Sequence, residues 1–180
     1  MAIQIPGGKT GAFYSTGGGV NSDQDTELSK ATGSSVAIVF DVGQRVNRMF
    51  YWGLQLAYAP SMSQPDCMTE CKVTNFKIGA DAMIHPHVEQ LPPKVDPYLG
   101  FGVNYDQLTV AADSSAPVSV YGMEFMNIQI GADYLAARHV SIGGYFATSF
   151  GMYFGADLSN TKSVELHEWF TLGVRGAFRP

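Results

Sequence analysis

The C-terminal segment VELHEWFTLGVRGAFRP alternates between two kinds of residue over most of its length. From Leu166 to Phe178, apolar residues recur at one parity, and smaller or polar residues, including Arg175, recur at the other. A period of two is the signature of a β-strand, because successive side chains of a strand point to opposite faces. The segment therefore predicts a long strand with two unlike faces, and each face needs a surrounding that explains it.

The same alternation recurs in seven earlier segments. They are the glycine-rich Lys9–Val20, then Ser34–Val42, Phe50–Ala59, Lys72–Ile84, Pro97–Tyr105, Val120–Tyr134 and Val140–Phe154. The connections differ in length: Asn21–Gly33, Ser61–Cys71, Asp106–Ser119 and Gly155–Ser163 are long and polar, whereas Gly43–Arg48 and Leu135–His139 are short and His85–Asp96 is proline-rich. Long loops on one rim and tight turns on the other are typical of an up-and-down outer-membrane barrel.

The composition agrees with one all-β domain spanning residues 1–180. With 46% hydrophobic and 15% charged residues the chain is neither disordered nor a helical membrane protein, and no stretch approaches the roughly 18 consecutive apolar residues of a membrane helix. The 20 glycines and 12% aromatic residues favour a closed β-structure. A net charge of −5 without a basic patch argues against a nucleic-acid partner. The start MAIQIPGGKT does not read as a signal peptide, so we expect a mature chain.

Alternation leaves open which face points inward. A soluble carrier of the lipocalin kind would turn its apolar face inward. Here the apolar face is too bulky for the inside of eight strands, and the opposite face is small and polar, with a glycine in most strands. We therefore predict an all-β, eight-stranded antiparallel up-and-down transmembrane β-barrel. Its predicted lipid-facing aromatics are Phe50, Trp52, Tyr58, Phe101, Tyr105, Phe146, Phe150, Phe170 and Phe178.

The inward parity carries charged residues that predict a polar network in the lumen: Asp41, Lys77, Asp81, Asp133 and Arg175. Unpaired charges would be costly in a narrow lumen, so we expect them to pair. Our hypothesis places Lys77 and Arg175 among the three aspartates, closing the periplasmic half. The alternative for Asp41 and Asp133 is that they reach water at a rim.

The chain resembles a known family. The segments DPYLGFGVNY (Asp96–Tyr105), IQIGADYLAARHVSIGGYF (Ile128–Phe146) and EWFTLGVRGAF (Glu168–Phe178) carry the likeness. They are similar to the small eight-stranded outer-membrane β-barrels of Gram-negative bacteria, the group that contains the transmembrane domain of outer membrane protein A. The resemblance implies a bacterial outer membrane, contact with lipids including lipopolysaccharide, and a terminal aromatic read by the barrel-insertion machinery. Here Phe178 is followed by Arg179 and Pro180, a departure from that ending.

Three motifs outside the predicted strands have alternative interpretations. Cys67 and Cys71 in PDCMTEC lie in a predicted extracellular loop, where an oxidising compartment favours a disulfide over two free thiols. NSDQDTE resembles the start of a calcium loop but lacks the glycine and glutamate of that motif, so we expect a solvated acidic loop. His85 and His87 in HPH lie in a proline-rich turn, where histidines commonly occur without a metal. We therefore expect no metal and no cofactor.

Enzyme chemistry is not expected. His139 and Ser141 share a parity that superficially suits a hydrolase, but no acid lies nearby in sequence. His167 with Ser149 and Glu165 is a second possible set, on the inward parity near the outer rim, and we favour neither. We expect a non-enzymatic outer-membrane barrel that acts as a structural or surface-interaction protein through its extracellular loops. Its partner there is unidentified. The alternatives are a small passive channel or transporter for small, including hydrophobic, solutes, a soluble lipocalin-like carrier and, last, an enzyme acting on lipids.

Overall fold

The eight expected strands form a closed ring. A computed structural model describes residues 1–8, 34–60, 71–112, 117–156 and 165–178. Each strand pairs antiparallel with the next, and the first pairs with the last, so the eight-stranded antiparallel β-barrel is confirmed. Among the described residues, no helix is long and apolar enough to cross a membrane. The strands are β1 (Ala2–Gly8), β2 (Ser35–Arg45), β3 (Phe50–Pro60), β4 (Cys71–Ile84), β5 (Val95–Ala112), β6 (Val118–Ala137), β7 (Val140–Ala156) and β8 (Glu165–Phe178).

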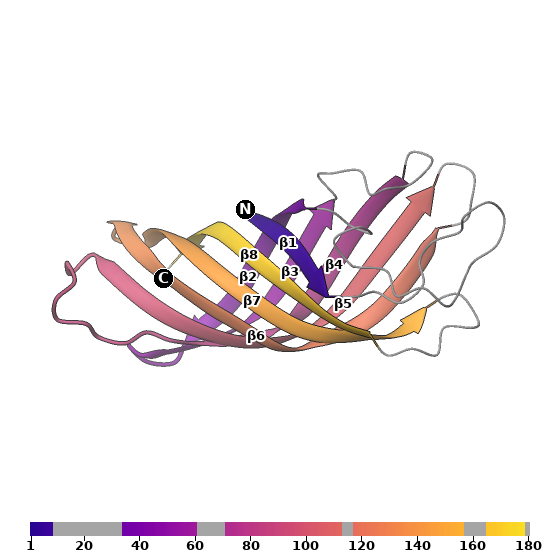
Figure 1. Cartoon of the computed structure of the whole chain (residues 1–180). Coiled ribbons are helices and arrows are strands. Elements are labelled where there is room, and N and C mark those ends of the chain that lie inside the picture. Colours follow the sequence, from indigo (N-terminus) through magenta and orange to yellow (C-terminus); the bar gives the residue numbers. More distant parts are fainter. Residues whose placement is uncertain (9–33, 61–70, 113–116, 157–164, 179–180) are drawn as a thin grey trace.

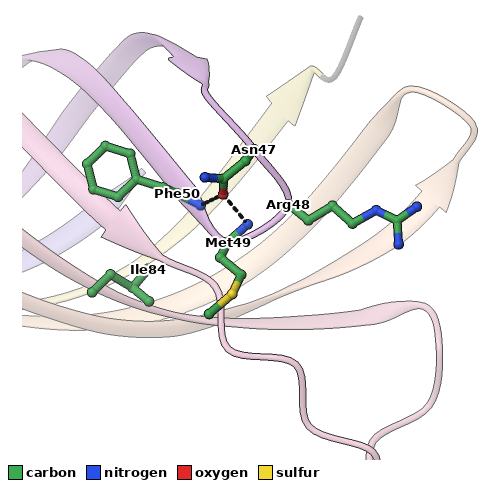
Figure 2. A pocket seen from close by; sticks show the side chains of 5 residues that line it. All are labelled: Asn47, Arg48, Met49, Phe50 and Ile84. Carbon is green, nitrogen blue, oxygen red and sulfur yellow. Dashed lines mark hydrogen bonds between the residues drawn. The ribbon is translucent and has the colours of Figure 1, made fainter.

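Three connections, two of them tight turns, lie together at one end of the barrel, which we call the turn end. They comprise residues 46–49, 85–94 and 138–139, and the opposite end is called the far end. Figure 1 shows the strands inclined to the long axis of the barrel, with β1 beside β8. The β2–β3 turn is closed by Asn47, whose side-chain oxygen accepts hydrogen bonds from the backbone N–H groups of Met49 and Phe50, both at 2.8 Å (Figure 2). An asparagine side chain stabilises a turn in this way.

The two faces of the sheet are as unlike as the alternation predicts. On β8, Leu172 points outward and is 64% exposed, whereas the polar His167 points into the lumen and is 2% exposed. Apolar residues outside and polar residues inside are the reverse of a soluble carrier's arrangement. Of the nine predicted lipid-facing aromatics, seven are exposed, Phe150 is half-buried, and the side chain of Phe178 is outside the described part.

The first strand lies nearer the N-terminus than the sequence predicts. β1 is Ala2–Gly8, which pairs with Thr171 and its neighbours on β8, whereas the predicted stretch Lys9–Val20 lies outside the described residues. Only Ile3 and Ile5 mark the outward face of β1, so its alternation is too short to be distinctive. The flanking strands supply the hydrogen bonds that make it a strand.

The connection predicted at Asp106–Ser119 is much shorter in the structure. β5 continues to Ala112 and β6 begins at Val118. Asp106 and Leu108 continue the inward parity of β5 and are both fully buried. In the sequence, Asp106 looks like the start of a polar loop. In the structure, it occupies a position of β5 that faces the lumen.

A β-bulge changes the parity of β6. Opposite β7, Glu124 pairs with Gly151 and Met126 pairs with Phe150, so β6 contains one extra residue. Both Phe125 and Met126 are exposed, whereas Glu124 is fully buried. Before the bulge the even positions face the lumen, and after it the odd positions do. A bulge redirects side chains in this manner, and it brings Glu124 inside although simple alternation from Met126 would place it outside.

Adjacent glycines on β7 provide a matched test of lumen packing. A Cβ on Gly143 would overlap the carbonyl oxygen of Ala132 and the carboxylate of Asp133, whereas a Cβ on Gly144 would lie 3.9 Å from its nearest neighbour, an ordinary contact. We expect Gly143→Ala to lower the free energy of unfolding by about 1–3 kcal/mol. Gly144→Ala should change it by less than about 1 kcal/mol.

Urea unfolding of both variants in the same lipid vesicles measures this difference. Equal stabilities of the two variants would contradict the inward placement of Gly143.

Candidate functional site

A buried ion pair crosses the middle of the lumen. Lys77 on β4 donates to Oε1 of Glu124 on β6, and both side chains are nearly inaccessible to solvent. Asn104 donates to Oε2 of Glu124 at 2.7 Å, and Ser149 donates to Oε1 at 2.8 Å. The ammonium group also lies 4.6 Å from the centre of the Trp169 ring, a cation–π contact. Glu124 is thus compensated by one cation and two neutral donors.

A second polar group lies next to this pair, toward the far end. Asp106 on β5 accepts hydrogen bonds from Asn75 and from the hydroxyl of Tyr153, the latter at 3.0 Å. His167 on β8 stacks on Tyr153 with 4.1 Å between the ring centres. The imidazole Nε2 lies 3.4 Å from Oδ2 of Asp106. Asp106 and His167 are both buried.

Apolar side chains enclose these polar groups. The surrounding cluster consists of Val73, Leu108, Val120, Tyr153 and Trp169. In such a medium, electrostatic interactions are stronger than in water, and an unpaired polar atom is correspondingly costly. The dense hydrogen bonding around Asp106 and Glu124 follows from that requirement.

Toward the turn end, the lumen contains a second cation. Nε of Arg175 lies 3.5 Å from Oδ1 of Asp133, and its guanidinium lies 4.6 Å from the centre of the Tyr98 ring. Arg175 also donates to the sulfur of Met83 at 3.0 Å. Asp41 accepts a hydrogen bond from the hydroxyl of Tyr51. Arg175, Asp41 and Tyr51 border a cavity of about 290 Å³, which Gln129 and Tyr145 also line, among others.

A polar cluster at the turn-end rim joins three strand ends. Arg45 at the end of β2 donates to Oδ2 of Asp96 at 2.9 Å. Nδ1 of His85, just after β4, lies 3.2 Å from the other oxygen of Asp96. His85 is therefore buried against Asp96, a structural contact, whereas His87 is exposed.

The structure distributes the five predicted lumen charges over two levels. Arg175 and Asp133 lie together toward the turn end, where Asp41 is exposed and Asp81 is half-buried. Lys77 lies farther along the lumen and has a different partner from those expected, because it pairs with Glu124. The sequence missed Glu124 because of the bulge. It missed Asp106 because the predicted strand ended at Tyr105, although the inward parity of Asn104 continues to Asp106.

The other predicted sites have simpler outcomes. Cys67 and all residues of NSDQDTE lie outside the described residues. The side chain of Cys71 also lies outside the described part. Ser141 is buried and His139 is exposed near the β6–β7 turn. Ser149 and His167 both face the lumen, but the hydroxyl of Ser149 donates to Glu124.

One external hollow lies at the turn end. It has a volume of about 550 Å³ and is lined by Asn47, Arg48, Met49, Phe50 and Ile84. Figure 2 shows the guanidinium of Arg48 extending away from Phe50 and Ile84. The hollow therefore has an apolar floor without a polar group directed into it, and we assign it no chemistry.

The comparisons with known proteins concern the fold. No protein-family model matches the chain, and no curated protein matches it. Among solved structures, the crystal structure of Neisserial surface protein A (NspA) matches with a TM-score of 0.57 and 14% sequence identity, covering 98% of this chain and 96% of that chain. At such an identity the likeness shows the fold alone. The chain therefore has the fold of NspA, an eight-stranded outer-membrane β-barrel of the kind formed by the transmembrane domain of outer membrane protein A.

Proposed function

We propose that this chain is a non-enzymatic outer-membrane barrel with a closed lumen, which acts through its extracellular connections as a structural or interaction element of the cell surface. The observation that carries the proposal is the packing in the middle of the lumen. The cavity at the level of Lys77 and Glu124 has a volume of about 20 Å³. That is room for about one water molecule, so a lumen filled in this way would not pass solutes while the ion pair is in place.

The orientation follows from the lengths of the connections. Outer-membrane barrels have short periplasmic turns and longer extracellular loops, so the turn end is assigned to the periplasm. The other connections then face the exterior and carry seven of the 16 acidic residues, namely Asp23, Asp25, Glu27, Asp66, Glu70, Asp113 and Asp157. Loops on a rigid scaffold are the usual place for binding. The proposed surroundings are outer-membrane lipids including lipopolysaccharide, the barrel-insertion machinery and an extracellular or envelope protein partner.

A conductance measurement tests the closed lumen. The chain is refolded in detergent, its folding is checked by the gel shift on heating, and it is inserted into a planar bilayer. We expect folded protein without discrete current steps, because the polar groups of the lumen are paired across its middle. A refolded open porin serves as the positive control. Discrete, reproducible currents would overturn the closed scaffold.

The cavity near Arg175 favours one second candidate, a small passive channel. Its volume of about 290 Å³ could admit a small solute from the turn end. Passage would then require the pair of Lys77 and Glu124 to separate. Discrete currents in the same bilayer experiment would support this candidate.

A further inference from the structure

Three potential metal ligands lie together in the lumen, and the proposed function does not use them as ligands. Asp106, Glu124 and His167 are each no more than 2% exposed, and their ligand atoms all lie within 4.8 Å of one another. They come from β5, β6 and β8, so the cluster spans the lumen. We propose that it binds one divalent transition-metal ion, with Zn²⁺ as the probe, and that the ion joins these three strands across the lumen.

The state of the His167 imidazole is a second observation that indicates a bound ion. Within the described residues, neither of its ring nitrogens has a partner at good hydrogen-bond geometry, although His167 is only 2% exposed. Burying a polar nitrogen in this state is unfavourable. Its Nε2 lies 3.4 Å from Oδ2 of Asp106. Two ligand atoms on one tetrahedral Zn²⁺, each about 2.0–2.1 Å from the ion, lie about 3.3 Å apart, so this separation suits two ligands of a shared ion.

Neighbouring side chains hold both carboxylates in place. Asn75 and Tyr153 donate to Asp106. Asn104 and Ser149 donate to Glu124. Carboxylates that ligate metals are commonly oriented by such outer donors. One imidazole with two carboxylates is a donor set that suits Zn²⁺ and related first-row ions.

A glycine keeps open the space between two of the ligands. In the strand register, Glu124 on β6 pairs with Gly151 on β7, and Gly151 pairs with His167 on β8. A Cβ on Gly151 would lie 2.6 Å from Nε2 of His167 and 2.6 Å from the carbonyl oxygen of Met123. The residue between the two ligands therefore has to lack a side chain if Nε2 is to face Glu124.

The charges of the cluster show what could take the place of a metal ion. Asp106 and Glu124 supply two negative charges, and Lys77 supplies one positive charge to Glu124. The remaining charge is balanced either by a metal ion at Nε2 of His167 or by a proton on that nitrogen. With the proton, the cluster would hold no ion and would consist of protein groups only. The experiment therefore has to distinguish the metal-bound cluster from the metal-free one.

Titration of the full, untagged chain separates them. The barrel is refolded in detergent without metal, with Cys67 and Cys71 oxidised, and is titrated with Zn²⁺ by calorimetry and with Co²⁺ by visible absorption. We expect one saturable ion per chain and a rise in Tm that a chelator reverses. Tyr153→Phe should weaken binding about 10–100-fold, since it removes an outer donor to a ligand. His167→Gln and Asp106→Asn should abolish the saturable binding.

His87→Gln is the matched control because His87 is exposed at the turn end. We expect it to leave the affinity unchanged. The proposal is overturned if no saturable binding occurs, if binding survives His167→Gln, or if His87→Gln removes it. Should His167→Gln not fold, X-ray absorption of the Zn²⁺-loaded natural chain decides. One imidazole with oxygen ligands supports the site, and sulfur or several imidazoles overturn it.

Discussion

Replacing Lys77 with methionine is expected to lower the free energy of unfolding by about 3–5 kcal/mol. The side chain of Glu124 is fully buried, and Lys77 supplies the cation that pairs with it. Methionine has a similar length but no charge, so the carboxylate would remain in an apolar enclosure with only neutral donors. Removing one partner of a buried pair is costly for this reason, even where the intact pair contributes little net stability. Reversible urea unfolding in lipid vesicles, followed by tryptophan fluorescence, measures the loss.

Two further variants separate charge from packing. Lys72 lies on the same strand and is exposed, so Lys72→Met should change the stability by less than about 0.5 kcal/mol. Glu124→Gln added to Lys77→Met removes the buried charge and keeps an amide at the same place. We expect this double variant to recover most of the loss. A loss below about 1 kcal/mol in Lys77→Met, or no recovery in the double variant, would contradict the buried pair.

Trp169→Ala is expected to have an effect of similar size, about 3–5 kcal/mol. Trp169 is 1% exposed and packs with Leu108, Val120 and their neighbours inside the barrel. Its ring also lies beneath the ammonium group of Lys77 at 4.6 Å. Truncation would open a cavity in the lumen and remove the cation–π contact. The same unfolding experiment measures the change. Circular dichroism replaces tryptophan fluorescence as the readout, because the substitution removes one of the two tryptophans and leaves only Trp52.

Trp169→Phe provides the matched control. Phenylalanine retains an aromatic ring and most of the buried volume, so we expect less than half of the loss seen with alanine. Equal losses in the two variants would mean that filling the lumen is not what Trp169 contributes. A loss within about 0.5 kcal/mol in both would place Trp169 outside the packed core.

Much of the fold is predictable from local pattern. The expected segments Phe50–Ala59, Lys72–Ile84 and Val140–Phe154 agree with β3, β4 and β7 to within two residues at each end. Alternation is a local property of a strand, and it repeats long enough in these segments to exclude other structures. β1 was misplaced because two isoleucines and a proline in seven residues do not make a distinctive pattern. Its position is determined by the two strands that it joins.

The candidate site is less predictable. Arg175 and Lys77 were both expected in the lumen, and both face it. Their partners depend on the stagger between strands, which closure of the ring determines and alternation does not reveal. Glu124 shows this most clearly, because the bulge in β6 reverses the parity that the residues after it indicate.

By itself, the sequence determined that the chain forms an all-β barrel and which side chains face outward on most strands. These properties depend on the contrast between successive residues, which is written into each segment separately. Only the tertiary structure decided that Lys77 meets Glu124 and that His167 meets Asp106. Such contacts join strands far apart in the sequence, and they depend on the register, the bulge and the closure of the barrel. A one-residue change in any of these would bring different side chains together.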